Sequence, residues 1–185
     1  AEGDVLTLTT EAHGTGGLAA QQMPLIHRIF RRELPALRTI VGEVPPGGTE
    51  RARSVAAHLH FVLDGLHHHH ANEDEMVWPL LLDRAGLDAR LVERMPQQHD
   101  QIDDAMALVR RAAEQWAQAP ASAAALVQSL GVLIEALQAH LAEEERLGLP
   151  RVEQHLPRHE GAEMVRDGLA TCTPAWRPSA GARPP

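Results

Sequence analysis

The feature that most constrains the fold of this chain is a motif that occurs twice. The segments His69–Pro79 and His140–Pro150 align without a gap, and both have His at position 1, Glu at position 5 and Pro at position 11. Residues four apart lie on the same face of a helix, so each His and Glu can present a nitrogen and an oxygen to one metal ion. The repeat therefore predicts two matching half-sites on two separate helices.

The composition favours helices and excludes several kinds of site. Ala and Leu dominate the 185 residues, β-branched residues are few, and Lys and Tyr do not occur. Cys172 is the single cysteine, which excludes an intramolecular disulfide and a CxxC metal site. The net charge of −8 argues against non-specific binding of nucleic acid.

The sequence shows no signal that directs it to a membrane or to secretion. No uninterrupted apolar run approaches the roughly 20 residues that span a bilayer. The N-terminal residues lack the basic and apolar regions of a secretory signal. We therefore expect a soluble, cytoplasmic protein without a membrane segment.

Apolar residues at helical spacing predict four long helices, separated by breaks rich in Pro, Gly and Ala. The predicted helices cover about 18–41, 49–79, 88–117 and 123–146. Short connections between long helices favour an all-α, up-down-up-down antiparallel four-helix bundle, here over residues 18–157. We expect an irregular lead-in at 1–17, a short extra helix within 158–170 and a mobile, disordered tail to residue 185.

An antiparallel bundle brings two more histidines to the level of the repeated motif. Residues equally far from a turn lie at equal heights, which matches Glu73 with His99 and His99 with His140, and less closely His27 with His69. Four His and two Glu then converge, enough for two metal ions bridged by the glutamates, with room for a small exogenous ligand. The predicted ligands are His27, His69, Glu73, His99, His140 and Glu144.

Some assignments within the motif stay open. The run His67–His70 offers His70 with Asp74 as a neighbouring alternative to His69 with Glu73. The remaining histidines of the run would then support the site, relay protons or face solvent. The residues that flank Glu144, Glu143 and Glu145, are interpreted as a solvated helix end.

Two other metal sites fit the sequence less well. A structural zinc site is closed by four ligands, whereas six residues converge here. Ferritin-like bundles use Glu-x-x-His, which is absent from this sequence.

The motif set resembles the hemerythrin-like, or HHE cation-binding, domain family. The resemblance covers about residues 20–157 and rests on HRIFRRELP from His27, HHANEDEMVWP from His69, HDQID from His99 and HLAEEERLGLP from His140. It implies a four-helix bundle with a non-haem di-iron centre, two iron ions joined by an oxo or hydroxo bridge. The four-His, two-Glu pattern most resembles the branch of iron-cluster repair and nitric-oxide-response proteins.

The chain departs from the oxygen-carrying members of that family at one position. Those members usually have a second histidine four residues after the third-helix histidine, and here that residue is Asp103. The departure argues against simple reversible O2 carriage and makes Asp103 a candidate for an additional or alternative ligand.

The sequence thus predicts a redox protein that binds or activates O2, NO or peroxide. One hypothesis is a di-iron oxidoreductase, an oxidase, oxygenase or peroxide-consuming enzyme supplied by an external electron donor. The alternative is a non-enzymatic O2 or NO sensor, a carrier or an iron donor. The sequence favours the enzyme and specifies neither an organic substrate nor an oligomeric state.

Overall fold

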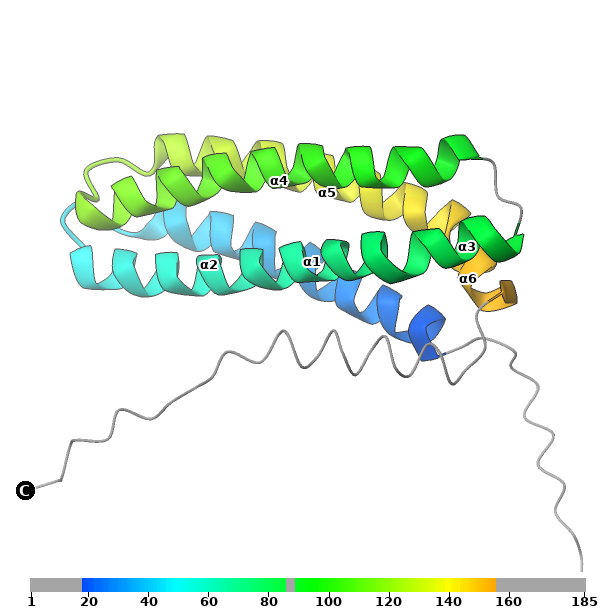
Figure 1. Cartoon of the computed structure of the whole chain (residues 1–185). Helices are drawn as coiled ribbons and strands as arrows, with labels where there is room; N and C mark the ends of the chain where they lie inside the picture. The colour runs from blue at the N-terminus through cyan, green and yellow to red at the C-terminus, as the bar shows by residue number, and fades with distance from the viewer. Residues whose placement is uncertain (1–17, 86–88, 156–185) are drawn as a thin grey trace, which may run out of the picture.

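The computed structural model describes residues 18–85 and 89–155, and within them the chain is helical and contains no strand (Figure 1). In chain order the helices are α1 (Leu18–Glu43), α2 (Thr49–Asn72), η1 (Glu73–Val77), α3 (Trp78–Ala85), α4 (Ala89–Gln118), α5 (Ala124–Leu147) and α6 (Leu149–His155). The predicted all-α four-helix bundle is confirmed. The lead-in, extra helix and tail predicted for 1–17 and 158–185 lie outside the described residues.

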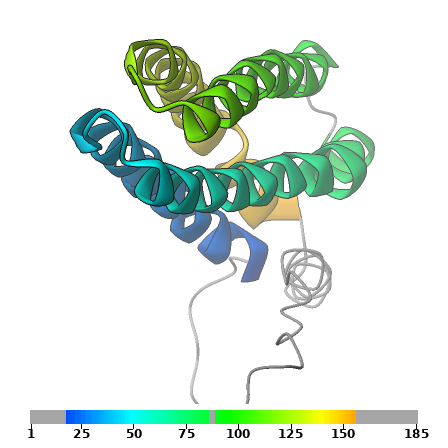
Figure 2. The same cartoon turned by 90° about the vertical axis from the view of Figure 1, so that its left-hand side faces the viewer.

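The four long helices pack in a square arrangement, in which each helix contacts two neighbours. Contacts join α1 to α2, α2 to α4, α4 to α5 and α5 back to α1. Figures 1 and 2 show α4 and α5 stacked over α1 and α2, and show α2, η1 and α3 as one continuous rod. The short α6 packs against α3 and α5 at one end.

Apolar side chains at intervals of three and four residues form the core, as the sequence predicts. On α5 the buried series is Leu126, Leu130, Leu133, Leu137 and Leu141. Each buried leucine stabilises the fold by about 1.5–3 kcal/mol relative to exposure. Residues 124–155 also contain an 18-residue window with a mean hydropathy of 1.3, which is long and apolar enough to cross a membrane by length and composition alone. Its leucine series packs inside the bundle, and that packing accounts for the hydropathy.

The core consists of two apolar clusters with a polar layer between them. On α1 the smaller cluster contributes Met23 and the larger contributes Phe30, with His27 between them. Leu66 on α2 belongs to the larger cluster, and Val77 on η1 belongs to the smaller one. The repeated motif therefore lies in a layer that apolar side chains close off at both ends.

The two loops at one end of the bundle are tied together. Gly47, in the α1–α2 connection, has a φ of 82°, which a residue with a side chain rarely adopts. Its N–H donates to the carbonyl oxygen of Pro120 in the α4–α5 connection, at 3.1 Å. This bond joins the two connections at the same end of the bundle.

The continuous helix formed by α2, η1 and α3 differs from the prediction. We expected a helix end or kink near Pro79, but the chain makes a π-helical turn at 73–77 and continues to Ala85. The N–H of Trp78 bonds to the carbonyl oxygen of Glu73, five residues back. Pro79 lies directly after this turn and has no N–H to donate to the preceding residues. π-turns of this kind often mark functional sites, and this one begins at a predicted metal ligand.

Candidate metal centre

The polar layer of the bundle contains an unusual concentration of buried ionisable side chains. Six of them are at most 3% exposed: His27, His70, Glu73, His99, His140 and Glu144. The side chain of His69 joins them at 9% exposure. Burying polar groups is costly unless something compensates for the lost water.

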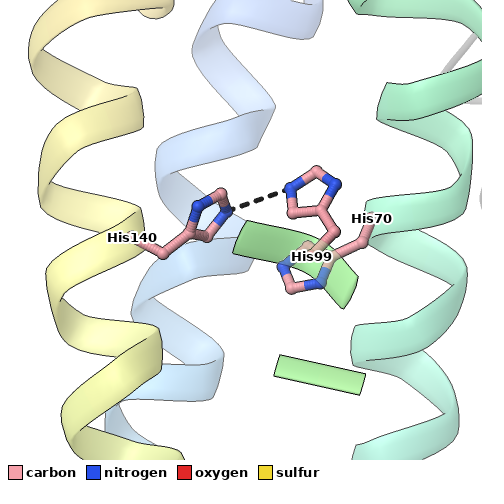
Figure 3. A group of neighbouring side chains, drawn as sticks. All are labelled: His70, His99 and His140. Atoms are coloured by element: carbon pink, nitrogen blue, oxygen red, sulfur yellow. Dashed lines mark hydrogen bonds between the residues drawn. The ribbon is translucent and has the colours of Figure 1, made fainter. Parts of the chain in front are cut away.

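The buried donors form two adjacent groups. One contains His70, His99 and His140, and the other contains His27, His69, Glu73 and Glu144. In each group the candidate ligand atoms all lie within 4.8 Å of one another. Figure 3 shows the first group: rings from α2, α4 and α5 point toward one another, and the Nε2 atoms of His99 and His140 are 3.1 Å apart. In the second group the Nε2 atoms of His27 and His69 are also 3.1 Å apart.

Each of the two glutamates faces both groups. Glu73 Oε1 lies 3.2 Å from His69 Nε2, and Glu73 Oε2 lies 3.7 Å from His99 Nε2. Glu144 Oε2 lies 3.2 Å from His27 Nε2 and 3.8 Å from His140 Nε2. Both carboxylates therefore lie between the two sets of histidines.

Two consecutive histidines on α2 serve different groups. Neighbouring residues diverge by about 100° around a helix axis, because a turn holds 3.6 residues. His69 consequently turns toward His27 on α1, whereas His70 turns toward α4 and stacks on His99 with ring centroids 4.1 Å apart. A run of histidines can thus supply both groups from a single helix.

Residues outside the two groups orient three of the rings. The Nδ1–H of His27 donates to Glu145 Oε1 at 2.9 Å. Arg31 holds that carboxylate in turn, with distances of 2.5 and 3.1 Å from its two terminal nitrogens. The Nδ1–H of His99 donates to Asp74 Oδ1 at 2.8 Å.

The third ring is held by a longer chain of contacts. The Nδ1–H of His140 donates to Gln98 Oε1 at 2.8 Å, and Gln98 Nε2 donates to Glu143 Oε2 at 2.8 Å. Arg94 forms an ion pair with Glu143. In all three rings the outward Nδ1 carries the proton, so the Nε2 lone pair points into the centre.

Burial keeps three of the imidazoles neutral. Desolvation lowers the pKa of His69 to about 3, that of His140 to about 4 and that of His70 well below its ordinary value. A neutral imidazole is the form that binds a metal ion. The lone pairs of these three histidines are therefore available at neutral pH.

The two carboxyl groups are shifted in opposite directions. Burial raises the pKa of Glu73 well above its usual range, and the neighbouring Glu144 raises it further. Burial also acts to raise the pKa of Glu144, but contact with His27 and the nearby histidines outweighs it and lowers that pKa to about 2. Without a cation, the pair thus tends to hold one proton, on Glu73.

Comparison with protein families gives a match that spans most of the chain. Residues 19–152 match the hemerythrin HHE cation-binding domain. The chain belongs to this family. Comparisons with curated proteins and with solved structures find no match. The hemerythrin match covers the four long helices except for Leu18, and it includes every buried donor described above.

The donor atoms of this hemerythrin domain fit a metal ion. Both ring nitrogens of His70 and all four carboxylate oxygens of Glu73 and Glu144 are buried without a hydrogen-bond partner. Leaving each such atom unpaired costs about 1–3 kcal/mol. Cations at the centres of the two groups would satisfy them with nitrogen and oxygen ligands of the kind that iron accepts.

The structure brings together all six residues that the sequence singles out as ligands. His70 joins them as a seventh donor, which the sequence offered as an additional or alternative ligand. Asp74, the partner proposed for His70, instead orients His99. Asp103 lies outside both groups: its carboxylate is 3.2 Å from His67 Nδ1, and its side chain is 40% exposed.

The interpretation of Glu143 and Glu145 as a solvated helix end is wrong. Both are partly buried and make the contacts to Gln98 and His27 described above. The sequence contained a partial signal for these roles, because Glu145 follows a predicted ligand and Arg31 lies one turn after His27. Gln98 carried no signal beyond its position next to His99.

Proposed function

We propose that this hemerythrin domain holds two iron ions and binds or activates O2, NO or peroxide there, as a redox enzyme. The observation that carries the proposal is the pair of adjacent donor groups with two glutamates facing both. A single structural zinc ion would need four ligands, and seven buried donors converge here. The oxo or hydroxo bridge expected between the irons is part of this proposal.

The residues divide unequally between the two ions. His70, His99 and His140 would hold one ion, and His27 and His69 would hold the other, with Glu73 and Glu144 bridging. Bound iron would supply reversible one-electron chemistry and an open coordination position. The group with His27 and His69 has one nitrogen fewer, so the exogenous ligand is expected on that side.

The protein's own contribution is to hold the ligands in one protonation state. Glu145, Asp74 and Gln98 keep the Nδ1 protons on the outer side of their rings. The apolar clusters above and below exclude water from the layer. Such outer contacts commonly change metal affinity by about 10–100-fold when removed.

The alternative is a non-enzymatic sensor, carrier or iron donor, and the burial of the donors favours it over an oxygenase. None of the seven donor side chains is more than 9% exposed, which gives an organic substrate little contact with the centre. An external donor would supply the electrons, and any partner would be another molecule. A cytoplasmic location stays a prediction.

Metal analysis after expression in iron-sufficient medium tests the proposal. We expect about two irons per chain and the optical bands of a bridged di-ferric centre, both diminished in His69→Ala and Glu144→Ala. One zinc per chain and no iron would refute the proposal. Steady consumption of O2, NO or peroxide would identify an enzyme, and stoichiometric binding would identify a sensor or carrier.

A further inference from the structure

The ring of His99 is hydrogen-bonded to a carboxylate whose negative charge is not balanced by an arginine. Its Nδ1 lies 2.8 Å from Asp74 Oδ1, and the side chain of Asp74 is 32% exposed. Asp74 makes no ion pair with an arginine among the residues that the structure describes. The other outward contact of this donor group, from His140 to Gln98, ends on a neutral amide, and the carboxylate beyond that amide is paired with an arginine. The donor group of His99 therefore has one unbalanced negative charge beside it.

The corresponding contact on the other side of the centre is balanced. The Nδ1–H of His27 donates to Glu145 Oε1 at 2.9 Å. Both oxygens of that carboxylate accept hydrogen bonds from Arg31, at 2.5 and 3.1 Å. A two-pronged contact of this kind places a full positive charge against the carboxylate. The donor group of His27 and His69 consequently gains no net charge from its outward contacts.

The charge of Asp74 acts on the buried groups of the centre. Burial lowers the pKa of His140 to about 4, whereas the charges of Glu144 and Asp74 act to raise it. A negative charge that favours a protonated imidazole also favours the higher positive charge of a ferric ion bound beside it. A carboxylate that accepts the Nδ1–H of a ligand also makes that ring a stronger donor. Both effects are larger in a buried site, where little water screens the charge.

We propose that these outward contacts set the order in which the two iron ions change valence. The ion held by His70, His99 and His140 is oxidised first, and the ion held by His27 and His69 stays ferrous. In this step one electron passes from the diferrous centre to a soluble one-electron acceptor such as ferricyanide, which is reduced to ferrocyanide. The remaining ferrous ion is then on the side where the exogenous ligand is expected. The inference rests on the proposed function, because it requires two iron ions.

Potentiometric titration of the iron-loaded protein, followed by electron paramagnetic resonance, tests this order. Only the half-oxidised centre has an odd number of electrons, so its signal appears between a lower midpoint potential, for the ion oxidised first, and an upper one, for the other ion. Asp74→Asn removes the charge and keeps an oxygen that can accept the Nδ1–H of His99. We expect the lower midpoint to rise by about 59 mV, the equivalent of a tenfold change in the equilibrium constant of a one-electron couple. The two midpoints should therefore approach each other.

Arg31→Gln tests the other side of the centre independently. It leaves the charge of Glu145 unbalanced, so the upper midpoint should fall by a similar amount and the two midpoints should again approach each other. Asp103→Asn and Arg32→Gln are the matched controls, because they remove the same charges from exposed side chains that contact none of the seven donors. Both controls should leave the separation of the midpoints unchanged.

The direction of the change decides the inference. If the ion at His27 and His69 were oxidised first, both substitutions would move the midpoints apart, and this result would overturn the proposed order. Unchanged midpoints in variants with two irons per chain would overturn the role of the contacts. Wild-type protein without iron would refute the proposed function and, with it, the inference. Nitrogen NMR of the metal-free protein should show His99 protonated on Nδ1 in wild type and in Asp74→Asn, and protonation on Nε2 would overturn the contact itself.

Discussion

The side chain of His70 gives the sharpest test of the centre, because its removal should have opposite effects with and without metal. It is 2% exposed, it stacks on His99, and neither of its ring nitrogens has a hydrogen-bond partner. Leucine has a similar volume and no polar atoms. The substitution His70→Leu therefore deletes one ligand while keeping the layer packed.

Both magnitudes can be worked out from the contacts. Binding of a four-ligand metal site is worth about 10–16 kcal/mol, or about 3 kcal/mol per ligand, so losing His70 should weaken the affinity of its group by about 100-fold. In the metal-free protein the two unpaired nitrogens each cost about 1–3 kcal/mol. Replacing them with leucine should raise the free energy of unfolding of that form by at least about 1 kcal/mol.

Competition with a chelator measures the first effect, and urea unfolding of the metal-free protein measures the second. The matched control is His67→Leu, three residues earlier on α2, where the imidazole is on the surface beside Asp103. The control should leave iron affinity unchanged. If His70→Leu also left it unchanged, or lowered the stability of the metal-free protein, His70 would be a packing residue and the second donor group would be misassigned.

Three further changes test other parts of the centre. Glu145→Ala should lower iron affinity by about 10–100-fold, because it frees the Nδ1 of His27, and an affinity within twofold of wild type would contradict this role. Gly148→Ala should lower the free energy of unfolding by about 1–3 kcal/mol in thermal melts, because a Cβ there would be 2.9 Å from the buried Trp78 ring; an unchanged melt would show that the ring can shift. The metal-free protein should lose stability as pH falls from about 6.5 to 4.5. Three buried histidines have lowered pKa values and Glu73 has a raised one, so the unfolded chain binds about two more protons (three minus one). The loss should be about 2–3 kcal/mol per pH unit in urea melts, and a flat profile would refute these protonation states.

The sequence predicted the bundle and six donors because both depend on spacing along a helix. Residues four apart share a face whatever the surrounding fold, and short loops between long helices leave few arrangements. His27 and His69 were the pair whose predicted heights agreed least, yet their Nε2 atoms are 3.1 Å apart. Side chains lean toward the N-terminus of their helix, so His27 reaches away from the first loop and His69 reaches back toward it.

The remaining parts of the centre depend on helix rotation and local distortion, which spacing does not determine. The sequence could not place His70 opposite His99, because that contact requires the orientation of α2 relative to α4. Nor could the sequence predict the π-helical turn that begins at Glu73, after which the helix continues beyond Pro79. The contact of Glu145 with His27 likewise joins residues 118 positions apart, on helices whose mutual rotation is set by the core.

At Asp103 this chain lacks a histidine of the family pattern. The number of nitrogen donors in the neighbouring group is nevertheless kept. That residue stands where the oxygen-carrying members of the family usually have a histidine, and here it lies on the surface beside His67. The nitrogen missing from α4 is supplied from α2, because the residue after His69 is also a histidine and points about 100° away from it. The group around His99 thus keeps three nitrogens, while the group around His27 keeps two.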